Sequence, residues 1–325
     1  MVVRPGTRSP IVSPLRSAPM PSPTPRIGDE VRRRLTARFG DDVGAWFDEL
    51  PAVLGVLAER WQIDFGPLIP HGSMSVVIRC QTADGRPAVL KISPDRARLA
   101  NEATALDSWA TVHTPTVLAV EESVGALLLE AIGPGVSLAK SGTYPRLEIV
   151  AELVTALHST GVPDPSYLTL AERIAYLFDS GTKPYTRHPE LIELVPPELY
   201  ERGRQLASRL VECVLPTALL HGDLTPRNIL DRGDERGLVA IDPAPCLGDD
   251  LAFDAIDLVL WLADDVDIIA ARAEQLAPAI GVDARRLLDW CTAFAAMTAL
   301  ELCEASDSSP DRIRVAVTLA SQAPE

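Results

Sequence analysis

The sequence predicts an α+β fold with two lobes, a strand-rich N-terminal lobe over residues 27–132 and a mainly helical C-terminal lobe over residues 133–325. Three observations lead to this class. The chain has 325 residues, 47% of them hydrophobic, which is enough for more than one core. Short apolar runs separated by turn residues fill residues 62–130, as in strands. Longer stretches with helical periodicity fill most of the chain beyond residue 145.

The chain begins with a segment that we exclude from the fold. Residues 1–26 contain seven prolines with scattered Arg and Ser, and no apolar run of a secretory signal, which predicts a disordered tail. A helix is then expected over Glu30–Phe39, capped by Asp29 and ended by Gly40. A short helix should precede Pro51, and Pro51 should begin the next one.

That next helix should bury one face formed by Val53, Val56, Leu57 and Trp61. The pattern then changes to the shorter apolar runs of strands, interrupted by one helix. The expected strands are Ile63–Ile69, Ser75–Gln81, Pro87–Ile92, Thr116–Glu121 and Ala126–Glu130, with a helix over Arg96–Ala110. The turn Thr82–Gly85 should join the second and third strands as a hairpin.

The rest of the chain is predicted to be helical around a short hairpin. The expected helices are Arg146–Ser159, Leu168–Ser180, Pro197–Val214, Leu251–Ala263, Val266–Leu276, Asp283–Ala305 and Asp311–Gln322. Trp261, Trp290 and Phe294 are expected to pack in the core and not to bind a cofactor.

The charge distribution limits the classes of partner. The net charge is −15, of which −1 lies in the chain through Gly133 and −14 lies beyond it. An acidic C-terminal half repels nucleic acids and phospholipid surfaces and attracts cations, which favours a small cationic substrate. No apolar run approaches the roughly 20 residues that a membrane helix needs. The five cysteines are dispersed and form no Cys-x-x-Cys, which is typical of a reduced, cytoplasmic protein without a zinc site.

The stretch from Leu219 to Asp242 carries the clearest chemical pattern. Asp223 and Asn228 are five residues apart in a loop containing Pro226, which prevents a regular helix there. The next residues have the pattern of a hairpin that would place Asp242 beside Asn228. Carboxylate and amide oxygens suit Mg²⁺, because phosphates and waters fill its remaining positions. Asp223 can accept the proton of a hydroxyl that attacks a γ-phosphate.

The order of these residues resembles a known class. His221-Gly-Asp223, with Asn228 five residues later and Asp242 after a hairpin, resembles the catalytic loop and metal strand of protein-kinase-like phosphotransferases. The run Ile-Asp-Pro-Ala-Pro-Cys-Leu-Gly-Asp at 241–249 more narrowly resembles the aminoglycoside/hydroxyurea antibiotic-resistance kinases, which include streptomycin 6-phosphotransferases.

The resemblance covers residues 42–305, although its specific motifs lie within 219–254. It implies a protein-kinase-like fold, in which a five-stranded antiparallel sheet with one key helix is hinged to a mainly helical lobe. ATP would then lie in the cleft between the lobes, and the acceptor would be a small hydroxylated molecule.

The resemblance also implies roles for single residues. Lys91 stands at the end of an apolar strand, where a charge is costly unless it is paired. It would hold the α- and β-phosphates of ATP, and Glu102 on the following helix would fix it. Asp223 would be the catalytic base or would orient the acceptor hydroxyl. Asn228 and Asp242 would hold Mg²⁺.

Two more segments would contact ATP. The loop containing Gly72 and Ser73 would cover the phosphates through its backbone N–H groups, while its neighbour His71 is expected to be a solvated loop residue. The backbone from Glu130 to Ile132 would form the linker between the lobes and hydrogen-bond the edge of adenine.

The remaining assignments concern the acceptor side. His221 is expected to hold the loop, and Arg227 either neutralises phosphate charge during transfer or pairs with a surface acid. Asp249, Asp250 and Asp254 are candidates for a rim that binds a cationic substrate, or for a helix N-terminus. Asp250 stands where the family usually has proline, and Asp254 comes one residue later than expected, so the acceptor side departs from the family pattern.

The sequence therefore predicts ATP- and Mg²⁺-dependent phosphorylation of a hydroxyl on a small antibiotic, first of all a streptomycin-like aminoglycoside, by a monomer that confers resistance. The same fold acting on hydroxyurea, a cyclic-peptide antibiotic or a metabolite is the nearest alternative. A non-catalytic kinase-like protein would normally lack Lys91, Asp223 or Asp242. A metal-dependent phosphoesterase would need clusters that the five histidines do not form, and a protein kinase would need Asp-Phe-Gly.

Overall fold

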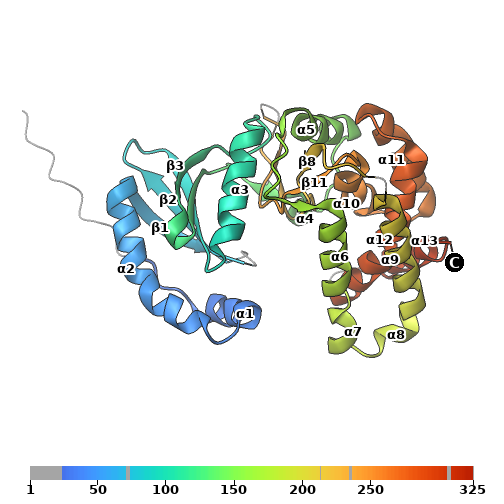
Figure 1. Ribbon diagram of the computed structural model, residues 1–325, viewed down its shortest axis with the longest axis horizontal. Coiled ribbons are helices and arrows are strands. Elements are labelled where there is room, and N and C mark those ends of the chain that lie inside the picture. Colours follow the sequence, from blue (N-terminus) through green and yellow to red (C-terminus); the bar gives the residue numbers. More distant parts are fainter. Residues whose placement is uncertain (1–23, 71–73, 213, 234–235, 306–308, 325) are drawn as a thin grey trace, which may run out of the picture.

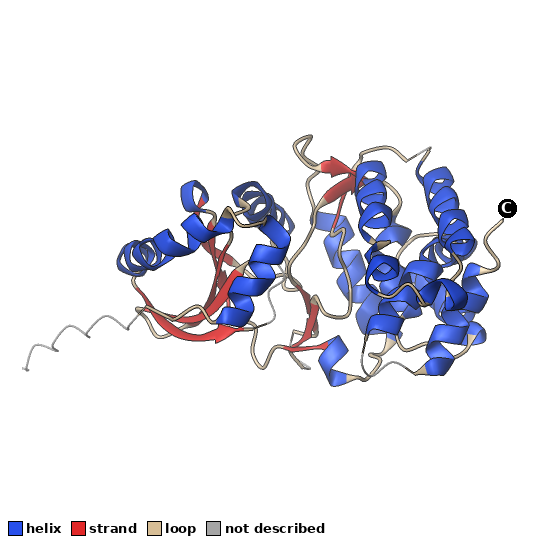
Figure 2. Ribbon diagram, turned by 90° about the horizontal axis from the view of Figure 1, so that it is seen from below, coloured by secondary structure: helices blue, strands red, loops and turns tan. Residues whose placement is uncertain are grey.

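The two predicted lobes are present and lie side by side along the long axis of the molecule (Figure 1). The computed structural model describes residues 24–70, 74–212, 214–233, 236–305 and 309–324. Figure 2 shows the large sheet confined to one lobe and most helices gathered in the other, with short strands between them. The predicted tail lies outside the described residues as far as residue 23, as do His71, Gly72 and Ser73.

The N-terminal lobe contains three helices and a five-stranded sheet. Its elements are α1 (Asp29–Phe39), α2 (Val43–Trp61), β1 (Ile63–Ile69), β2 (Val76–Thr82), β3 (Pro87–Ile92), α3 (Arg96–Trp109), β4 (Val117–Glu121), the 3₁₀ turn η1 (Glu122–Val124) and β5 (Ala126–Glu130). All pairs are antiparallel, and the strand order is β1-β2-β3-β5-β4. The expected five-stranded sheet is confirmed, because period-two alternation and the turn ending at Gly85 fix its registers.

The prediction for the second helix was wrong in two respects. Helix α2 is continuous, and Pro51 lies inside it and does not begin it. Of the predicted face, Leu57 is buried and Val53 and Trp61 pack against the core, whereas Val56 is exposed. The most buried positions are Phe47, Leu50 and Leu54, together with Leu57. A proline removes one helical hydrogen bond, but packing of this apolar face against the sheet offsets that loss.

The C-terminal lobe is mainly helical. Its elements are β6 (Val136–Ser137), α4 (Leu138–Ser141), α5 (Leu147–Thr160), β7 (Leu168–Thr169), α6 (Leu170–Ser180), α7 (Lys183–Arg187), α8 (Leu191–Leu194), α9 (Pro197–Val211), β8 (Ala218–Leu220), β9 (Ile229–Asp231), β10 (Leu238–Ala240), β11 (Cys246–Gly248), η2 (Leu251–Ala255), α10 (Ile256–Leu260), α11 (Val266–Ala279), α12 (Ala284–Glu304) and α13 (Pro310–Ala320). The predicted helix starting at Leu168 begins two residues later, because Leu168 and Thr169 pair with β11.

Two small sheets carry the motif region. One has the order β10-β9-β6, and the other has the order β7-β11-β8. In the first, Ile229 faces Ala240 across the antiparallel hairpin, as the sequence predicted. The loop between β8 and β9 holds the His-Gly-Asp sequence. Because β8 belongs to one small sheet and β9 to the other, this loop lies where the two sheets meet.

Helix α3 joins the two lobes. Its buried residues Leu99, Leu106 and Trp109 belong to the same apolar core as the helices of the C-terminal lobe, although the helix lies in the N-terminal half of the sequence. The Trp109 ring stacks on His221 of the motif loop, with ring centroids 5.8 Å apart. The helix that carries Glu102 is therefore packed directly against the loop that carries Asp223.

The long helix α12 organises the C-terminal core. Trp290 is fully buried and Phe294 is buried, as expected, while Trp261 is only half-buried. Within the described residues, no helix combines the length and apolarity that a bilayer-spanning segment requires.

Candidate active site

The lysine of the third strand lies where two carboxylates meet. Lys91 Nζ is 2.6 Å from Glu102 Oε2 on α3 and 2.9 Å from Asp242 Oδ1 after β10. Lys91 and Glu102 are both buried, and Arg98 Nη2 adds a weaker contact to Asp242 at 3.5 Å. A buried ammonium is tolerated only with such partners, so the predicted pairing of Lys91 with Glu102 is observed in the structure.

This charge arrangement favours the ionised forms of Lys91 and Asp242, whereas burial raises the pKa of Glu102. Although burial opposes it, the carboxylates of Asp242 and Glu102 raise the pKa of Lys91. Burial also works against ionisation of Asp242, but Lys91 and Arg98 lower the pKa of that carboxyl to about 2. Both groups are therefore charged at neutral pH, before any ligand arrives.

The motif loop depends on a glycine. Gly222 has φ +73°, and a Cβ at this position would lie 2.0 Å from the carbonyl oxygen of Ala244. The N–H groups of His221 and Gly222 donate to Asp254 at 2.8 and 2.9 Å. Only glycine fits both the left-handed backbone and the close approach, which explains the residue between His221 and Asp223.

The carboxylate of Asp223 is held from two sides. Asn228 Nδ2 donates to Asp223 Oδ2 at 2.8 Å, and Arg173 Nη2 on α6 lies 3.4 Å from Oδ1. About a third of the Asp223 side chain is exposed, so it can still meet an acceptor. Because its Nδ2 is used in this bond, the Oδ1 atom of Asn228 remains available for a cation.

The hairpin brings the metal candidates together. The N–H of Ile241 donates to the carbonyl oxygen of Asn228 at 2.8 Å, which places Asp242 next to the motif loop. Asp242 has φ +56°, a conformation that Asp adopts more readily than most residues. Lys91, Asp223, Asn228 and Asp242 thus meet in one region, linked by contacts that join three separate parts of the chain.

The linker between the lobes is fixed by an arginine of the hairpin. Arg236 Nη1 is 2.6 Å from Glu130 Oε1, and its Nη2 donates to Thr114 O at 2.8 Å. The Glu130 side chain is therefore turned toward the hairpin. The N–H of Ala131 donates to Pro87 O at 3.3 Å, so this N–H is already used within the sheet. An adenine contact here would fall to the backbone of Glu130 or Ile132.

His221 has the surroundings of a structural residue. It is fully buried, and burial lowers its pKa despite the nearby carboxylates of Asp254 and Asp223. Its Nδ1 accepts from the N–H of Asp223 at 3.3 Å, and its ring stacks on Trp109. A neutral imidazole in this position holds the loop, in agreement with the prediction.

The predicted acidic rim does not fit the structure. Asp254 is buried and holds the loop backbone together with His158 Nε2, which is 3.0 Å away. Asp250 is buried too, and its Oδ2 accepts from Trp290 Nε1 at 2.6 Å and Arg286 Nε at 2.7 Å. Both carboxylates are used inside the protein, so the prediction that they contact substrate was wrong.

Asp249 does not fit the predicted acidic rim either, for a different reason. It is exposed, but it follows Gly248, which pairs with Ala218 at the far end of β8 from the motif loop. Its Oδ1 accepts from the N–H of Leu215 at 3.1 Å. The strand register therefore directs Asp249 away from Asp223.

Other acids face the motif loop. Asp257 on α10 is half-buried, and burial together with the charges of Glu301 and Asp223 raises its pKa to about 7, although Arg227 opposes the shift. The pKa of Glu301 on α12 is raised by desolvation, Asp223 and Glu304, although the residue as a whole is exposed. These carboxylates repel one another, and Arg227 is the cation that interacts with both. Arg227 is exposed, and the choice between its two predicted roles stays a prediction.

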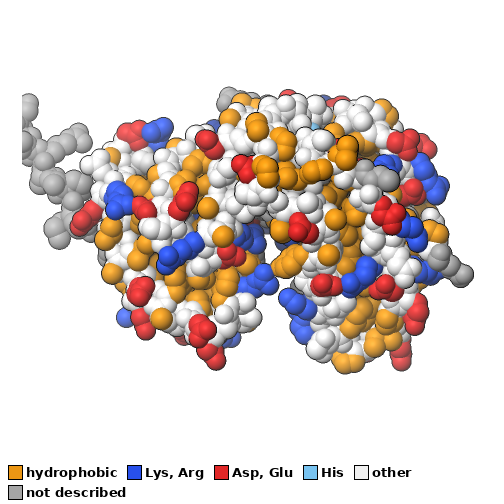
Figure 3. All heavy atoms as spheres, in the orientation of Figure 1, with side chains coloured by type: hydrophobic (Ala, Val, Ile, Leu, Met, Phe, Trp, Pro, Cys, Tyr) orange, Lys and Arg blue, Asp and Glu red, His pale blue; other side chains and the backbone are white. Residues whose placement is uncertain are grey.

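Helix α1 links the two walls of the groove between the lobes. Arg38 Nη2 donates to the Tyr176 hydroxyl of α6 at 2.8 Å, and Arg34 Nη1 donates to Pro70 O at 2.7 Å. Figure 3 shows the notch between the lobes, with basic side chains on both of its sides.

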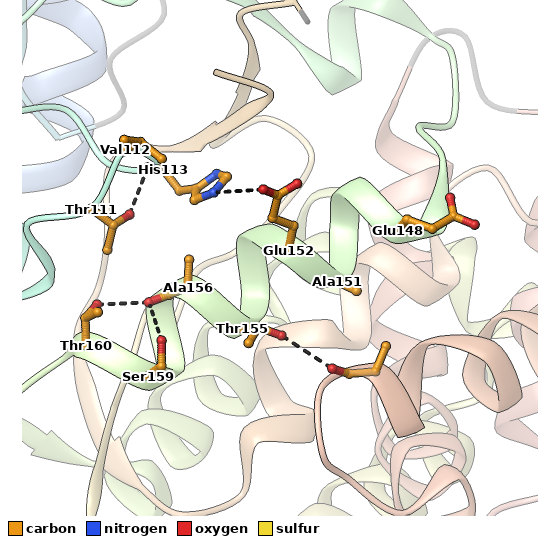
Figure 4. Close-up of a pocket in the computed structure, with 11 residues that line it drawn as sticks. Thr111, Val112, His113, Glu148, Ala151, Glu152, Thr155, Ala156, Ser159 and Thr160 are labelled. Atoms are coloured by element: carbon orange, nitrogen blue, oxygen red, sulfur yellow. Dashed lines mark hydrogen bonds and ion pairs between the residues drawn. The ribbon is translucent and has the colours of Figure 1, made fainter. Parts of the chain in front are cut away.

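Two surface hollows contain none of these residues. One, of about 520 Å³, lies between the loop after α3 and α5, and there His113 points toward Glu152 (Figure 4). The other, of about 550 Å³, lies between residues 24–32 and α2. The site is therefore defined by the convergence of its side chains.

The fold and this convergence define a two-lobe, kinase-like phosphotransferase. The model of the aminoglycoside/hydroxyurea antibiotic resistance kinases matches residues 60–305. The chain is 27% identical over 283 residues to streptomycin 6-kinase of Streptomyces griseus, covering 82% of this chain and 87% of that protein. It is 28% identical over 291 residues to streptomycin 6-kinase of Streptomyces glaucescens, covering 87% and 92%.

Solved structures show the same fold at lower identity. Choline kinase LicA from Streptococcus pneumoniae matches with a TM-score of 0.56 and 13% identity, over 83% of this chain and 98% of that one. The GDP and kanamycin complex of APH(2")-IIIa matches with a TM-score of 0.52 and 18% identity, over 83% and 97%.

The chain belongs to the aminoglycoside/hydroxyurea antibiotic resistance kinase family. It is a phosphotransferase with an alcohol group as acceptor, it uses a nucleotide, and its α+β protein-kinase-like fold is as predicted.

Several residues of the site were missed in the sequence. Arg173 was detectable, because it is a charge on the otherwise apolar buried face of α6. Asp257 carried a weaker signal, as an acid in a very apolar run. His158 and Glu301 gave none, because only tertiary packing brings their helices to the motif loop.

Proposed function

We propose that this kinase transfers the γ-phosphoryl group of ATP to a hydroxyl of a streptomycin-like aminoglycoside and thereby confers resistance. The observation that carries the proposal is the convergence of Lys91, Asp223, Asn228 and Asp242 beside the groove between two lobes. These four residues supply a phosphate-binding cation, a base and two oxygen ligands in the arrangement that phosphoryl transfer requires.

The donor set fits Mg²⁺. Asp242 keeps its Oδ2 and Asn228 its Oδ1 free of the contacts described above, and hard oxygens of this kind are its preferred ligands. No cluster of three or more His, Cys, Asp or Glu side chains that could hold a metal was found in the described part of the chain. A site with few protein ligands suits an ion that phosphates and waters complete. When bound, Mg²⁺ would neutralise charge on the phosphates.

The protein groups account for the proton and the charge. The acceptor oxygen forms a bond to the γ-phosphorus as the bond from that phosphorus to the β,γ-bridging oxygen breaks, which releases ADP. Asp223 takes the hydroxyl proton, while Asn228 and Arg173 hold its carboxylate in place. Lys91, fixed by Glu102, binds the α- and β-phosphates. The backbone of Glu130 and Ile132 would hold adenine.

The choice of a streptomycin-like acceptor rests on charge and on relatives. The relatives from Streptomyces griseus and Streptomyces glaucescens are both named streptomycin 6-kinase. Asp257 and Glu301 interact electrostatically with Asp223, and their pKa values are raised first by burial and then by repulsion from neighbouring carboxylates. A cationic acceptor bound here would relieve that repulsion. We assign the acceptor-binding role to these two acids in place of Asp249, Asp250 and Asp254.

The test is a panel assay. The purified protein is incubated with ATP and Mg²⁺ and with streptomycin, kanamycin, hydroxyurea, a cyclic-peptide antibiotic or a peptide library. The masses of the products are then measured by mass spectrometry. Streptomycin should gain about 80 dalton, the mass of one phosphoryl group. Modification of another small alcohol but not streptomycin would overturn the assigned acceptor. Modification of peptides alone would overturn the antibiotic function.

A further inference from the structure

An arginine outside the motifs contacts the predicted base. Arg173 lies in the first half of α6, whose start is fixed by a capping box between Thr169 and Glu172. The buried face of this helix consists of Leu170, Arg173, Ile174 and Phe178, and Arg173 is nine-tenths buried. Removing a guanidinium from water is costly unless it is well bonded. Its partners therefore indicate its role.

The guanidinium divides its donors between backbone and side chain. Its Nε donates to the carbonyl oxygen of Gly222 at 2.9 Å, and its Nη2 is 3.4 Å from Asp223 Oδ1. The planar fork of arginine can satisfy both acceptors at once, whereas the point charge of a lysine cannot reproduce that geometry.

The peptide units of the motif loop are thereby held on both sides. Asp254 accepts from the N–H groups of His221 and Gly222, while Arg173 donates to the carbonyl oxygen of Gly222. Glycine adopts the left-handed conformation of Gly222 without strain but is also free to leave it, so these hydrogen bonds select one arrangement of the peptide. The side chain that follows, Asp223, points from a backbone with little freedom to rotate.

We propose that Arg173 is the positioning residue of phosphoryl transfer, which sets the orientation of the Asp223 carboxylate toward the acceptor hydroxyl. Asn228 holds Asp223 Oδ2 from the metal side, and Arg173 holds Oδ1 from the acceptor side. About a third of the Asp223 side chain stays exposed beside these two donors. The proposal rests on the proposed function in that Asp223 is taken as the base.

The position of Arg173 also connects the base to the opposite wall of the groove. Its guanidinium lies 5.6 Å from the centre of the Tyr176 ring, and the Tyr176 hydroxyl accepts from Arg38 of α1.

The test compares Arg173→Ala, Arg173→Lys and the matched control Arg204→Ala. Arg204 is also stacked on an aromatic ring and donates to a backbone carbonyl, but its partners are Phe178 and Asp179, away from the motif loop. In Arg173→Ala, kcat should fall by roughly 100-fold, as expected when a reacting group is misplaced by about 1 Å. Nucleotide affinity should be unchanged, and millimolar guanidinium should restore part of kcat. Arg204→Ala should keep the wild-type kcat.

Two further results decide against a merely structural role. Arg173→Lys retains the charge and should fold, yet it should recover only a part of kcat. The crystal structure of Arg173→Lys, compared with that of the wild type, should show the Asp223 carboxylate turned away from its wild-type position. This measurement needs neither an acceptor nor the proposed activity. Wild-type kcat in a folded Arg173 variant, or an Asp223 carboxylate that has not moved, would overturn the proposal. Absence of transfer by the wild type to every acceptor would count against the proposed function alone.

Discussion

The two sides of the groove differ in how their charges are balanced. On the nucleotide side, Glu102 and Asp242 both contact Lys91, and Arg98 adds a second cation 3.5 Å from Asp242. The pKa of Asp242 is lowered to about 2 as a result. Burial raises the pKa of Glu102, although Lys91 opposes that shift. On the acceptor side, burial raises the pKa values of Asp257 and Glu301, that of Asp257 to about 7, although the charge of Arg227 opposes both shifts.

This difference indicates what each side is built to receive. The nucleotide side is electrostatically complete and needs little rearrangement before it binds phosphates, which is how preorganised sites stabilise charge during a reaction. On the acceptor side, burial and repulsion from neighbouring carboxylates disfavour the ionised forms of Asp257 and Glu301, and a bound cation would favour them. The affinity of this side for a substrate should therefore depend strongly on the positive charge that the substrate brings.

Asp223 lies at the boundary of the two sides, and its change should give the largest effect. In Asp223→Asn, kcat should fall by about 10²–10⁴-fold, the usual contribution of a general base. Nucleotide binding should persist, because Lys91, Glu102 and Asp242 remain paired. The measurement is steady-state kinetics with nucleotide titration by calorimetry. Asp249→Asn, at the far end of β11, is the matched control and should keep its activity. An active Asp223→Asn enzyme would contradict the assigned base.

Glu102→Gln tests whether the nucleotide side depends on its charge balance. The change leaves Lys91 with Asp242 alone in a buried position, which should lower the free energy of unfolding by about 1–3 kcal/mol and raise the KM for ATP. Urea denaturation and kinetics measure the two effects. Glu121→Gln removes an exposed partner of Arg60 and should change neither. Equal stability of the two variants would mean that the buried pair is not needed.

Asp257→Asn and Glu301→Gln test the acceptor side. Each should raise the KM for a cationic acceptor and leave the KM for ATP unchanged. For half-buried Asp257 the change should be about tenfold, or ~1.4 kcal/mol, as for the loss of one charge-assisted hydrogen bond. The exposed Glu301 should give a smaller change, because solvent screens it. Glu274→Gln, in an exposed position of α11, serves as control. If the KM for ATP rises instead, the two sides are not separable in this way.

The same comparison explains which site residues could be predicted from the sequence. Lys91, Asp223, Asn228 and Asp242 were predicted because short-range rules place them, as a charge in an apolar strand or as polar residues around a hairpin. The strands were predicted for the same reason. Arg173 could have been noticed as a charge within an apolar helical face. The acceptor side was predicted wrongly, because proximity in sequence to the motif suggested Asp250 and Asp254, which packing buries.

The acids that do face Asp223 come from α10 and α12, and no local pattern shows which turn of a helix faces the motif loop. Local patterns also do not show which lobe a helix packs against. Helix α3 follows the third strand in the sequence, yet Leu106 and Trp109 pack with the C-terminal helices. Pro51 shows the reverse case, in which a strong local signal for a helix start yielded to tertiary packing of α2.

A pH dependence of stability should also distinguish the two sides. Asp257 keeps its proton in the folded protein up to a pH of about 7, whereas in the unfolded chain it ionises near 3.8. The folded state therefore binds more protons between these values, and the contribution of Asp257 to stability is present below pH 4 and lost as the pH rises through about 7. Thermal denaturation between pH 5 and pH 8 should show this loss in the wild type. In Asp257→Asn the decline should be shallower, and an added cationic acceptor should reduce it in the wild type, because the bound cation favours the ionised carboxylate. Parallel curves for the wild type and Asp257→Asn would show that this carboxyl carries no excess proton, and the contrast between the two sides would then rest on Glu301 alone.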